Sequence, residues 1–223
     1  MTAMNALIED NGITLSMDTL VSTRKKNGKV VPYYYTQKFE YYPFTKSILC
    51  GTGDFNVIQK VMNFSKKILS KEVETFTELI DDFLIENHFS KSKETSTIYI
   101  LGFDDNLLPH AFALRSTNDY SIEEVANYNH PNFLMKPSSV EISKYFSLLK
   151  NTENSDDLFK KLMRKEKEID DNTAQDKRVG IGGENILISV LPYDGKLMSV
   201  CKTIDVFDDY DNQYNYCLKH INN

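Results

Sequence analysis

Residues 2–19, with the sequence TAMNALIEDNGITLSMDT, decide the fold. Apolar side chains dominate on both sides of a polar turn at residues 9–12, which ends in Asn-Gly. An Asn-Gly pair between two apolar runs is typical of a β-hairpin. Antiparallel pairing brings the two ends of a hairpin together, and this turn lies about midway between Thr2 and Asp18. The pattern therefore predicts that Thr2 and Asp18 are neighbours.

Thr2 is a candidate nucleophile because it directly follows Met1. If Met1 is removed, Thr2 carries a hydroxyl group and a free α-amine, and the amine can act as the base for the hydroxyl. The first residues have neither the basic region nor the apolar region of a signal peptide. We therefore expect the mature chain to begin near Thr2. Many unrelated chains begin Met-Thr, so this residue gains a function only if the groups around it support one.

The composition is that of a soluble globular protein. At 223 residues, with 41% hydrophobic and 26% charged residues, the chain is long enough to bury a substantial core. We expect a single domain over residues 1–223. The formal net charge of -6 argues against binding to nucleic acid or to anionic lipid. No stretch approaches the roughly 20 apolar residues that span a bilayer, so we expect neither nucleic acid nor a membrane as a partner.

Metal and disulfide chemistry are not indicated. The three cysteines are odd in number and widely spaced, and no CxxC pair occurs. The four histidines are scattered without the spacing of metal ligands. We expect no metal and no cofactor, and the cysteine usage fits the reducing cytoplasm.

The rest of the chain divides into runs of strands and runs of helices. Helical spacing of apolar residues occurs at residues 57–69 and 73–87, and a very polar helix is expected at about 156–169. Ser138, followed three residues later by Glu141, resembles a capping box at the start of a further helix. This order favours an α+β protein in which antiparallel sheets are covered by helices. The remaining expected elements are strands at 30–42, 47–50, 97–102 and 110–115, a loop at 170–177, and a closing hairpin formed by 186–191 and 196–204.

Several features occur in a telling order along the chain. Asp18 follows Thr2 by 16 positions (18 minus 2), and Lys38 lies on the aromatic segment that comes next. Gly51 is in the turn CGTGD before a helix, and a glycine pair at 182–183 precedes the closing hairpin. In this order and spacing the chain resembles the proteasome-type peptidases of the N-terminal-nucleophile (Ntn) hydrolase superfamily. The resemblance implies a four-layer αββα sandwich, in which two stacked antiparallel sheets are flanked by helices.

The resemblance also implies a role for each of four residues. Thr2 would be the nucleophile, and Lys38 would tune the acid–base groups beside it, because a nearby ammonium disfavours further positive charge. Asp18 would hold that ammonium by a charge-assisted hydrogen bond, and the backbone N–H of Gly51 would stabilise the oxyanion. The implied activity is a peptidase that cleaves amide bonds with Thr2 after Met1 is removed. Each residue also has a purely structural interpretation: Asp18 as a turn cap, Lys38 as a surface lysine and Gly51 as a requirement of turn geometry.

Three residues differ from the pattern of this family. Arg178 and Ile181 stand where many active members carry an aspartate and a serine that support the terminal amine, and Leu20 stands where arginine is frequent. Asp176 or Ser139 could take over the supporting role. The differences favour an alternative, a catalytically inactive proteasome-like scaffold or interaction protein. A small-molecule amidase or acylase is a third interpretation, because the nucleophile does not specify the acyl group.

Partners follow from the same resemblance. Related subunits pack through their helices and form chambers that restrict access. We therefore expect a cytoplasmic homo-oligomer that acts on a peptide or protein substrate, with an ATP-dependent unfoldase that feeds it.

Overall fold

The computed structural model describes residues 2–92, 94–150 and 154–220, which form strands, five α-helices and two short 3₁₀ segments. The strands are β1 (Met4–Glu9), β2 (Gly12–Asp18), β3 (Leu20–Arg24), β4 (Val30–Tyr35), β5 (Phe39–Tyr42), β6 (Ser47–Gly53), β7 (Ser96–Phe103), β8 (Pro109–Arg115), β9 (Ile122–Asn127), β10 (Asn132–Lys136), β11 (Glu184–Tyr193) and β12 (Lys196–Val206). The helices are α1 (Phe55–Ser65), α2 (Val73–Glu86), α3 (Val140–Leu149), α4 (Ser155–Asn172) and α5 (Tyr210–His220).

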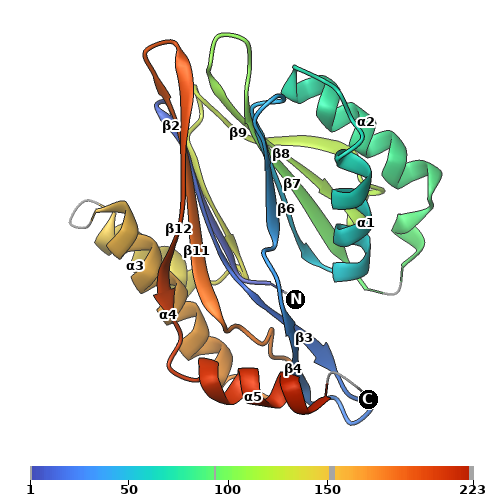
Figure 1. The fold of residues 1–223 in the computed structure, drawn as a ribbon, viewed down its shortest axis with the longest axis vertical. Helices are drawn as coiled ribbons and strands as arrows, with labels where there is room; N and C mark the ends of the chain where they lie inside the picture. Colours follow the sequence, from blue (N-terminus) through green and yellow to red (C-terminus); the bar gives the residue numbers. More distant parts are fainter. Residues whose placement is uncertain (1, 93, 151–153, 221–223) are drawn as a thin grey trace.

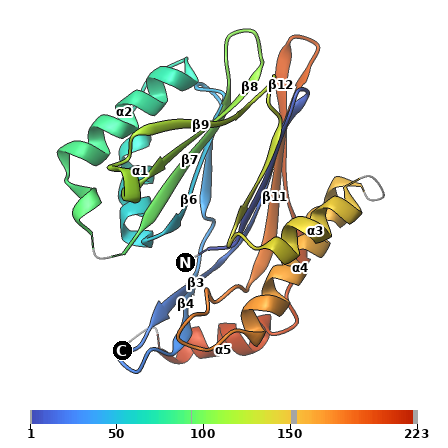
Figure 2. The same ribbon diagram turned by 180° about the vertical axis from the view of Figure 1, so that it is seen from behind.

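The strands form two five-stranded sheets and one two-stranded ribbon, and all pairs between neighbouring strands are antiparallel. The first sheet has the order β10-β1-β2-β11-β12, the second has the order β5-β6-β7-β8-β9, and β3 pairs with β4. The two sheets face each other, with α1 and α2 beside the second sheet and α3 and α4 beside the first (Figure 1 and Figure 2). The expectation of an α+β protein built on antiparallel sheets is confirmed.

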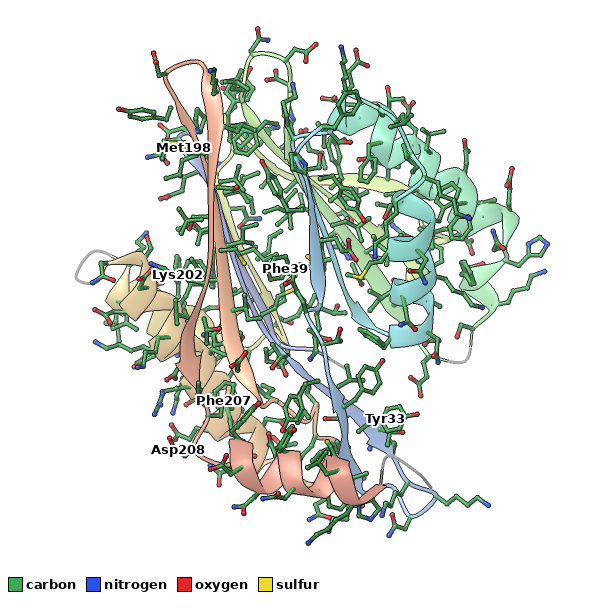
Figure 3. All side chains as sticks on the ribbon, viewed as in Figure 1. Tyr33, Phe39, Met198, Lys202, Phe207 and Asp208 are labelled. Carbon is green, nitrogen blue, oxygen red and sulfur yellow. The ribbon has the colours of Figure 1, made fainter. Side chains whose placement is uncertain are left out.

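The opening hairpin is present as predicted. β1 pairs with β2 along its whole length, and the turn falls at residues 10–11. Met4 and Leu15 of this hairpin pack in one apolar cluster with Tyr99 of the second sheet. Phe39 belongs to the same cluster and points into the space between the sheets (Figure 3). Successive side chains of a strand point to opposite faces of a sheet. The residues of the β1–β2 hairpin that alternate with these apolar positions therefore point away from the second sheet, toward α4.

The helices bury the outer face of each sheet. Ile58 of α1 and Phe76 of α2 pack against Ile98 of β7. On the other side, Leu162 of α4 packs in a cluster with Phe133 of β10. No helix within the described ranges is long and apolar enough to cross a membrane.

Two expected helix boundaries are wrong. The helix expected to open at Ser138 is capped by Ser139, whose hydroxyl accepts the N–H of Ile142 at 3.1 Å. Glu141 lies 3.0 Å from Lys165 of α4 in an ion pair and so does not take part in the expected capping box. In addition, α4 extends to Asn172, although residues 170–177 were expected to be a loop.

Three strands, β3, β9 and β10, and one helix, α5, were not expected from the sequence. The short strands β9 and β10 lie at edges of the two sheets. The closing hairpin β11–β12 is confirmed, but α5 follows it. In α5, Cys217 is the buried residue, and the ring of Tyr210 packs at a tilt against Tyr35 of β4 with 5.3 Å between the ring centroids. This helix therefore depends on tertiary contacts rather than on a continuous apolar face.

Candidate active site

Asp18, at the end of β2, is the centre of a buried polar group next to the start of the chain. Its Oδ1 atom accepts the backbone N–H of Ala3 at 3.0 Å and an ammonium hydrogen bond from Lys38 Nζ at 2.8 Å. Its Oδ2 atom accepts the backbone N–H of Gly182 at 3.2 Å. The carboxylate thus joins β1, the segment before β5 and the segment before β11. The Ala3 contact places Asp18 against the residue that follows Thr2.

Lys38, which directly precedes β5, is buried, and its hydrogen-bond partners belong to β2 and β3. The side chains of Lys38 and Asp18 are each only 1% exposed, so the alternative of a surface lysine is wrong. Lys38 Nζ also donates to the carbonyl oxygen of Leu20 at 2.5 Å. Burial lowers the pKa of Lys38, while the charge of Asp18 and the hydrogen bond that Lys38 donates to it act in the opposite direction. The pair therefore holds a positive charge that proton loss removes more easily than in a free lysine.

Thr2 lies in the wall of a cavity of about 190 Å³. Thr52 of β6, Thr97 of β7 and Lys136 of β10 contribute other polar side chains to this wall, and Val179 closes it from the segment before β11. Thr2 itself is buried. The cavity is thus built from both sheets at the end where the chain starts. Met1, whose removal the nucleophile hypothesis requires, lies outside the described residues.

A larger cleft adjoins this cavity. It has a volume of about 520 Å³ and shares Gly53, Thr95 and Val179 with the cavity at Thr2. The cleft runs between the β3–β4 ribbon and the start of α1, where Tyr33 and Phe55 give it aromatic walls. Figure 3 shows Tyr33 on the ribbon. An extended ligand could therefore reach Thr2 from the ribbon side.

Gly51 lies in β6 opposite Ile98 and is not part of the cavity wall as the structure describes it. A Cβ atom added at Gly51 would lie 2.9 Å from Cγ1 of Ile58 and 3.0 Å from the carbonyl oxygen of Thr97. Close packing between β6 and α1 therefore accounts for the glycine. Thr52 and Gly53, the next two residues of β6, line the cavity instead, and no sequence pattern distinguished them as site residues.

Arg178 and Ile181, two of the residues that differ from the family pattern, make contacts with neighbouring segments. Arg178 donates through Nε to the carbonyl oxygen of Thr173 at 2.9 Å, so its side chain turns back to the end of α4. Ile181 is buried in an apolar cluster with Ala3 and Phe207. Leu20, the third departure, is buried and supplies the carbonyl oxygen that Lys38 binds.

Asp176 and Ser139 are not brought to the nucleophile position. Ser139 caps α3, as described above. Asp176 is an exposed residue whose backbone carbonyl oxygen accepts a hydrogen bond from Arg24. Neither residue is in the cavity wall that contains Thr2, as far as the described residues define it.

Two buried carboxyl groups of α4 were missed by the sequence-based interpretation. Asp170 accepts the backbone N–H groups of Val179, Gly180 and Ile181 at 2.6, 2.8 and 3.3 Å. Glu166, one turn earlier, accepts a hydrogen bond from Asn5 Nδ2 at 2.8 Å. Both carboxyl groups are in a helix that looks solvent-exposed because of its many charged residues. The buried positions would have been visible only from the helical spacing of Glu166 and Asp170 with the few apolar residues of α4.

No metal site accompanies these groups. Within the described ranges, no group of three or more His, Cys, Asp or Glu side chains could hold a metal ion.

Comparison with known proteins identifies the fold. The chain is similar to the Gly-1 mutant of Anbu from Hyphomicrobium sp. strain MC1, with a TM-score of 0.66, 12% identity, and coverage of 100% of this chain and 95% of that chain. It is also similar to Anbu from the same strain, with a TM-score of 0.62, 12% identity and the same coverage. Anbu (ancestral beta-subunit) from Yersinia bercovieri gives a TM-score of 0.60 at 9% identity, with coverage of 99% and 94%.

The sequence comparisons correct one expectation. No family model matches this chain, and no curated protein matches it. The identification of the chain as a member of the proteasome-type peptidases is therefore wrong, because identities of 9–12% to solved structures show a common fold and nothing further. What this chain shares with Anbu over almost its whole length is a proteasome-related fold.

Proposed function

We propose that this chain is an amide hydrolase that uses Thr2 as an N-terminal nucleophile, with a peptide as the preferred substrate. The observation that carries the proposal is the buried Asp18–Lys38 pair, which is hydrogen-bonded to the backbone directly after Thr2. Burying two charges costs free energy that a purely structural contact rarely recovers. A charged pair kept at this position is therefore best explained by chemistry at Thr2.

The proposed reaction needs a free α-amine on Thr2, so whatever precedes this residue must be removed. The amine has an ordinary pKa of about 8, so a useful neutral fraction can accept the proton of the Thr2 hydroxyl as it attacks the carbonyl carbon. The ammonium group of Lys38 would disfavour a second positive charge beside it and so favour the neutral amine. Asp18 would keep the ammonium in place.

A backbone N–H near Gly51 is the proposed donor to the oxyanion. One such donor contributes about 3 kcal/mol to the stabilisation of the transition state. Gly51 was selected from the sequence, while Thr52 and Gly53 are the residues of β6 in the wall beside Thr2. Gly51 is the proposed donor, and Thr52 and Gly53 form the cavity surface beside Thr2.

The proposal extends to the architecture and the assembly. We propose that residues 1–223 form a single domain with the four-layer αββα arrangement of Ntn hydrolases, and that the chain acts as a homo-oligomer in the cytoplasm. The description of the Yersinia relative as an ancestral beta-subunit supports an assembly. The same proposal includes an ATP-dependent unfoldase that delivers substrate to the chain. Such a partner is needed only if the substrate is a folded protein.

A second candidate function is a catalytically inactive scaffold. Arg178 and Ile181 favour it, because the Arg178 side chain binds the end of α4 and the Ile181 side chain is apolar, so neither supplies the hydrogen bonds expected at these positions to support the amine. The scaffold and the hydrolase share the fold and differ only in the reactivity of Thr2.

Mass spectrometry separates the two candidates. The intact mass first establishes whether Thr2 is the terminal residue, and treatment with a β-lactone or an epoxyketone then reports its reactivity. We expect one adduct, mapped to Thr2, and a loss of peptide cleavage of at least about 10³-fold in Thr2→Ala. Thr52→Ala, which removes another hydroxyl from the same cavity wall, should still form the adduct.

Each other outcome has a meaning. A chain that has Thr2 as its terminal residue and forms no adduct is a scaffold, and the hydrolase proposal is then wrong. An adduct on Thr2 together with cleavage of small amides but not of peptides indicates an amidase or acylase.

A further inference from the structure

Glu166 is a buried acidic side chain that the proposed reaction does not use. It lies in α4 and is only 2% exposed. Its Oε2 atom accepts a hydrogen bond of 2.8 Å from Nδ2 of Asn5, a fully buried residue of β1 that lies three positions after Thr2. The Glu166–Asn5 contact is therefore a direct link between α4 and β1, the strand that begins two residues after Thr2.

The remaining oxygen atom of each partner lacks a donor. Oε1 of Glu166 and Oδ1 of Asn5 are both buried, and neither has a hydrogen-bond partner among the described residues. A buried acceptor without a donor destabilises the folded state. An ionised carboxylate only accepts hydrogen bonds, whereas a protonated one donates through its O–H group. A primary amide and a carboxylic acid can therefore satisfy each other with two hydrogen bonds, one in each direction.

The surroundings favour the neutral acid. Asp18 of β2 acts on Glu166 with a charge of the same sign, and β11 contributes the neutral amide of Asn185, which binds Ser16 at 2.6 Å. Asp170, one turn along α4, is occupied by backbone N–H groups. Burial, followed by the Asp18 charge, raises the pKa of Glu166 well above its ordinary value, although the Asn5 hydrogen bond acts in the opposite direction. The positive charge of Lys38 is paired with Asp18.

We propose that Glu166 is a neutral carboxylic acid in the folded protein and that its proton, on Oε1, completes a two-way hydrogen-bonded pair with the side chain of Asn5. The pair holds β1 against α4. Glu166 is therefore a positioning residue for the start of the chain. Loss of the proton leaves a buried negative charge that faces Asp18 and two acceptors without donors. The inference concerns the fold around Thr2 and does not require that Thr2 hydrolyses anything.

The sign of the pH effect follows from linkage. A folded state that binds the proton more tightly than the unfolded chain is favoured at low pH. As the pH rises above about 4.3, the ordinary pKa of glutamate, the unfolded chain releases this proton and the folded chain keeps it. For one proton, the folding equilibrium constant falls tenfold per pH unit until the pH reaches the pKa in the folded state, and it then levels off.

Glu166→Gln tests the proposal, because glutamine keeps both hydrogen bonds and cannot ionise. Its carbonyl oxygen accepts from Asn5 and its amide group donates to Asn5. We measure urea unfolding of the full chain at a series of pH values for the wild type, Glu166→Gln, and the control Glu168→Gln. Glu168 lies in the same helix with its side chain 61% exposed. We expect the ratio of wild-type to Glu166→Gln folding constants to fall tenfold per pH unit above about 4.3, while Glu168→Gln follows the wild type.

A second measurement keeps the test valid if Glu166→Gln does not fold. Carbon-13 labelling of the glutamate carboxyl groups in the wild type should reveal one resonance that stays protonated well above the titration range of the others. Hydrogen exchange adds a local readout: the protection of the β1 amides should decline at high pH in the wild type and stay constant in Glu166→Gln. A wild-type to Glu166→Gln ratio that does not change with pH, or the absence of a protonated glutamate resonance, would overturn the proposal.

Discussion

Removal of the ammonium group of Lys38 is the sharpest test of the buried pair. In Lys38→Met the aliphatic volume is retained, and the charge that faces Asp18 at 2.8 Å is lost. Asp18 keeps its hydrogen bonds from the backbone N–H groups of Ala3 and Gly182. The substitution therefore isolates the electrostatic part of the contact and leaves the backbone part in place.

The expected loss of stability follows from burial. Removing one partner of a buried ion pair costs about 3–5 kcal/mol, because the other charge stays buried without compensation. The two remaining N–H donors of Asp18 place this case near the lower end, at about 3 kcal/mol. For a chain of this length, 1 kcal/mol corresponds to roughly 2–4 °C in Tm, so Tm should fall by about 6–12 °C. Asp18→Asn in the Lys38→Met background should restore part of the loss, since it removes the uncompensated charge.

Urea unfolding followed by circular dichroism measures the free energy of unfolding for each variant. The matched control is Lys202→Met, which makes the same chemical change in the Lys202–Asp156 pair. Lys202 lies on β12 (Figure 3), its Nζ atom is 2.6 Å from Asp156, and the two side chains are 44% and 46% exposed. A pair this exposed contributes about 0.2–1 kcal/mol. If Lys38→Met costs no more than Lys202→Met, the argument from burial is wrong, and so is the main support for the proposed site.

Two further predictions concern packing and thiol reactivity. Gly51→Ala should lower the free energy of unfolding by about 1–3 kcal/mol, because its Cβ would lie 2.9 Å from Ile58 Cγ1; urea unfolding measures the loss, and an unchanged stability would show that α1 is free to shift. A thiol reagent such as a dithiobis-nitrobenzoate should label exposed Cys201 first in the native protein and spare buried Cys50. Burial raises the pKa of both thiols, so labelling of Cys201 should accelerate as the pH rises, and equal rates for the two residues would contradict the described packing.

Elements governed by local signals were predictable from the sequence. The β1–β2 hairpin has an Asn-Gly turn and apolar strands, and α1 and α2 have helical spacing of apolar residues, so each signal lies within the element itself. β10 is only five residues long, and its place in the sheet depends on pairing with β1, more than a hundred residues away. α5 has a single buried residue, Cys217, and is held by tyrosine contacts to β4. No local pattern identifies elements of this kind.

The same distinction between local and long-range signals applies to the candidate site. The neighbourhood of Asp18 and the start of the chain followed from hairpin geometry alone. The burial of Lys38 did not follow, because the aromatic segment around it gives no sign of which face is covered by the ribbon. Glu166 and Asp170 were missed because a helix with so many charged residues reads as solvated. The spacing of these two residues, four positions apart, becomes informative only when the sheet that they face is known.

The segment at 179–182 decides how the departures from the expected pattern should be interpreted. Four consecutive backbone N–H groups in this segment bind carboxylates: three bind Asp170 of α4, and that of Gly182 binds Asp18. Its first residue, Val179, lines the cavity at Thr2. Carboxylates therefore hold the backbone of this segment at both ends, in addition to the contacts that the side chains of Arg178 and Ile181 make. The identity of these two residues removes possible hydrogen bonds to the amine of Thr2, but it does not disorder the wall around that residue. In the proposed function, reactivity at Thr2 would depend on Asp18 and Lys38, which are the groups that the adduct experiment and the Lys38→Met variant examine.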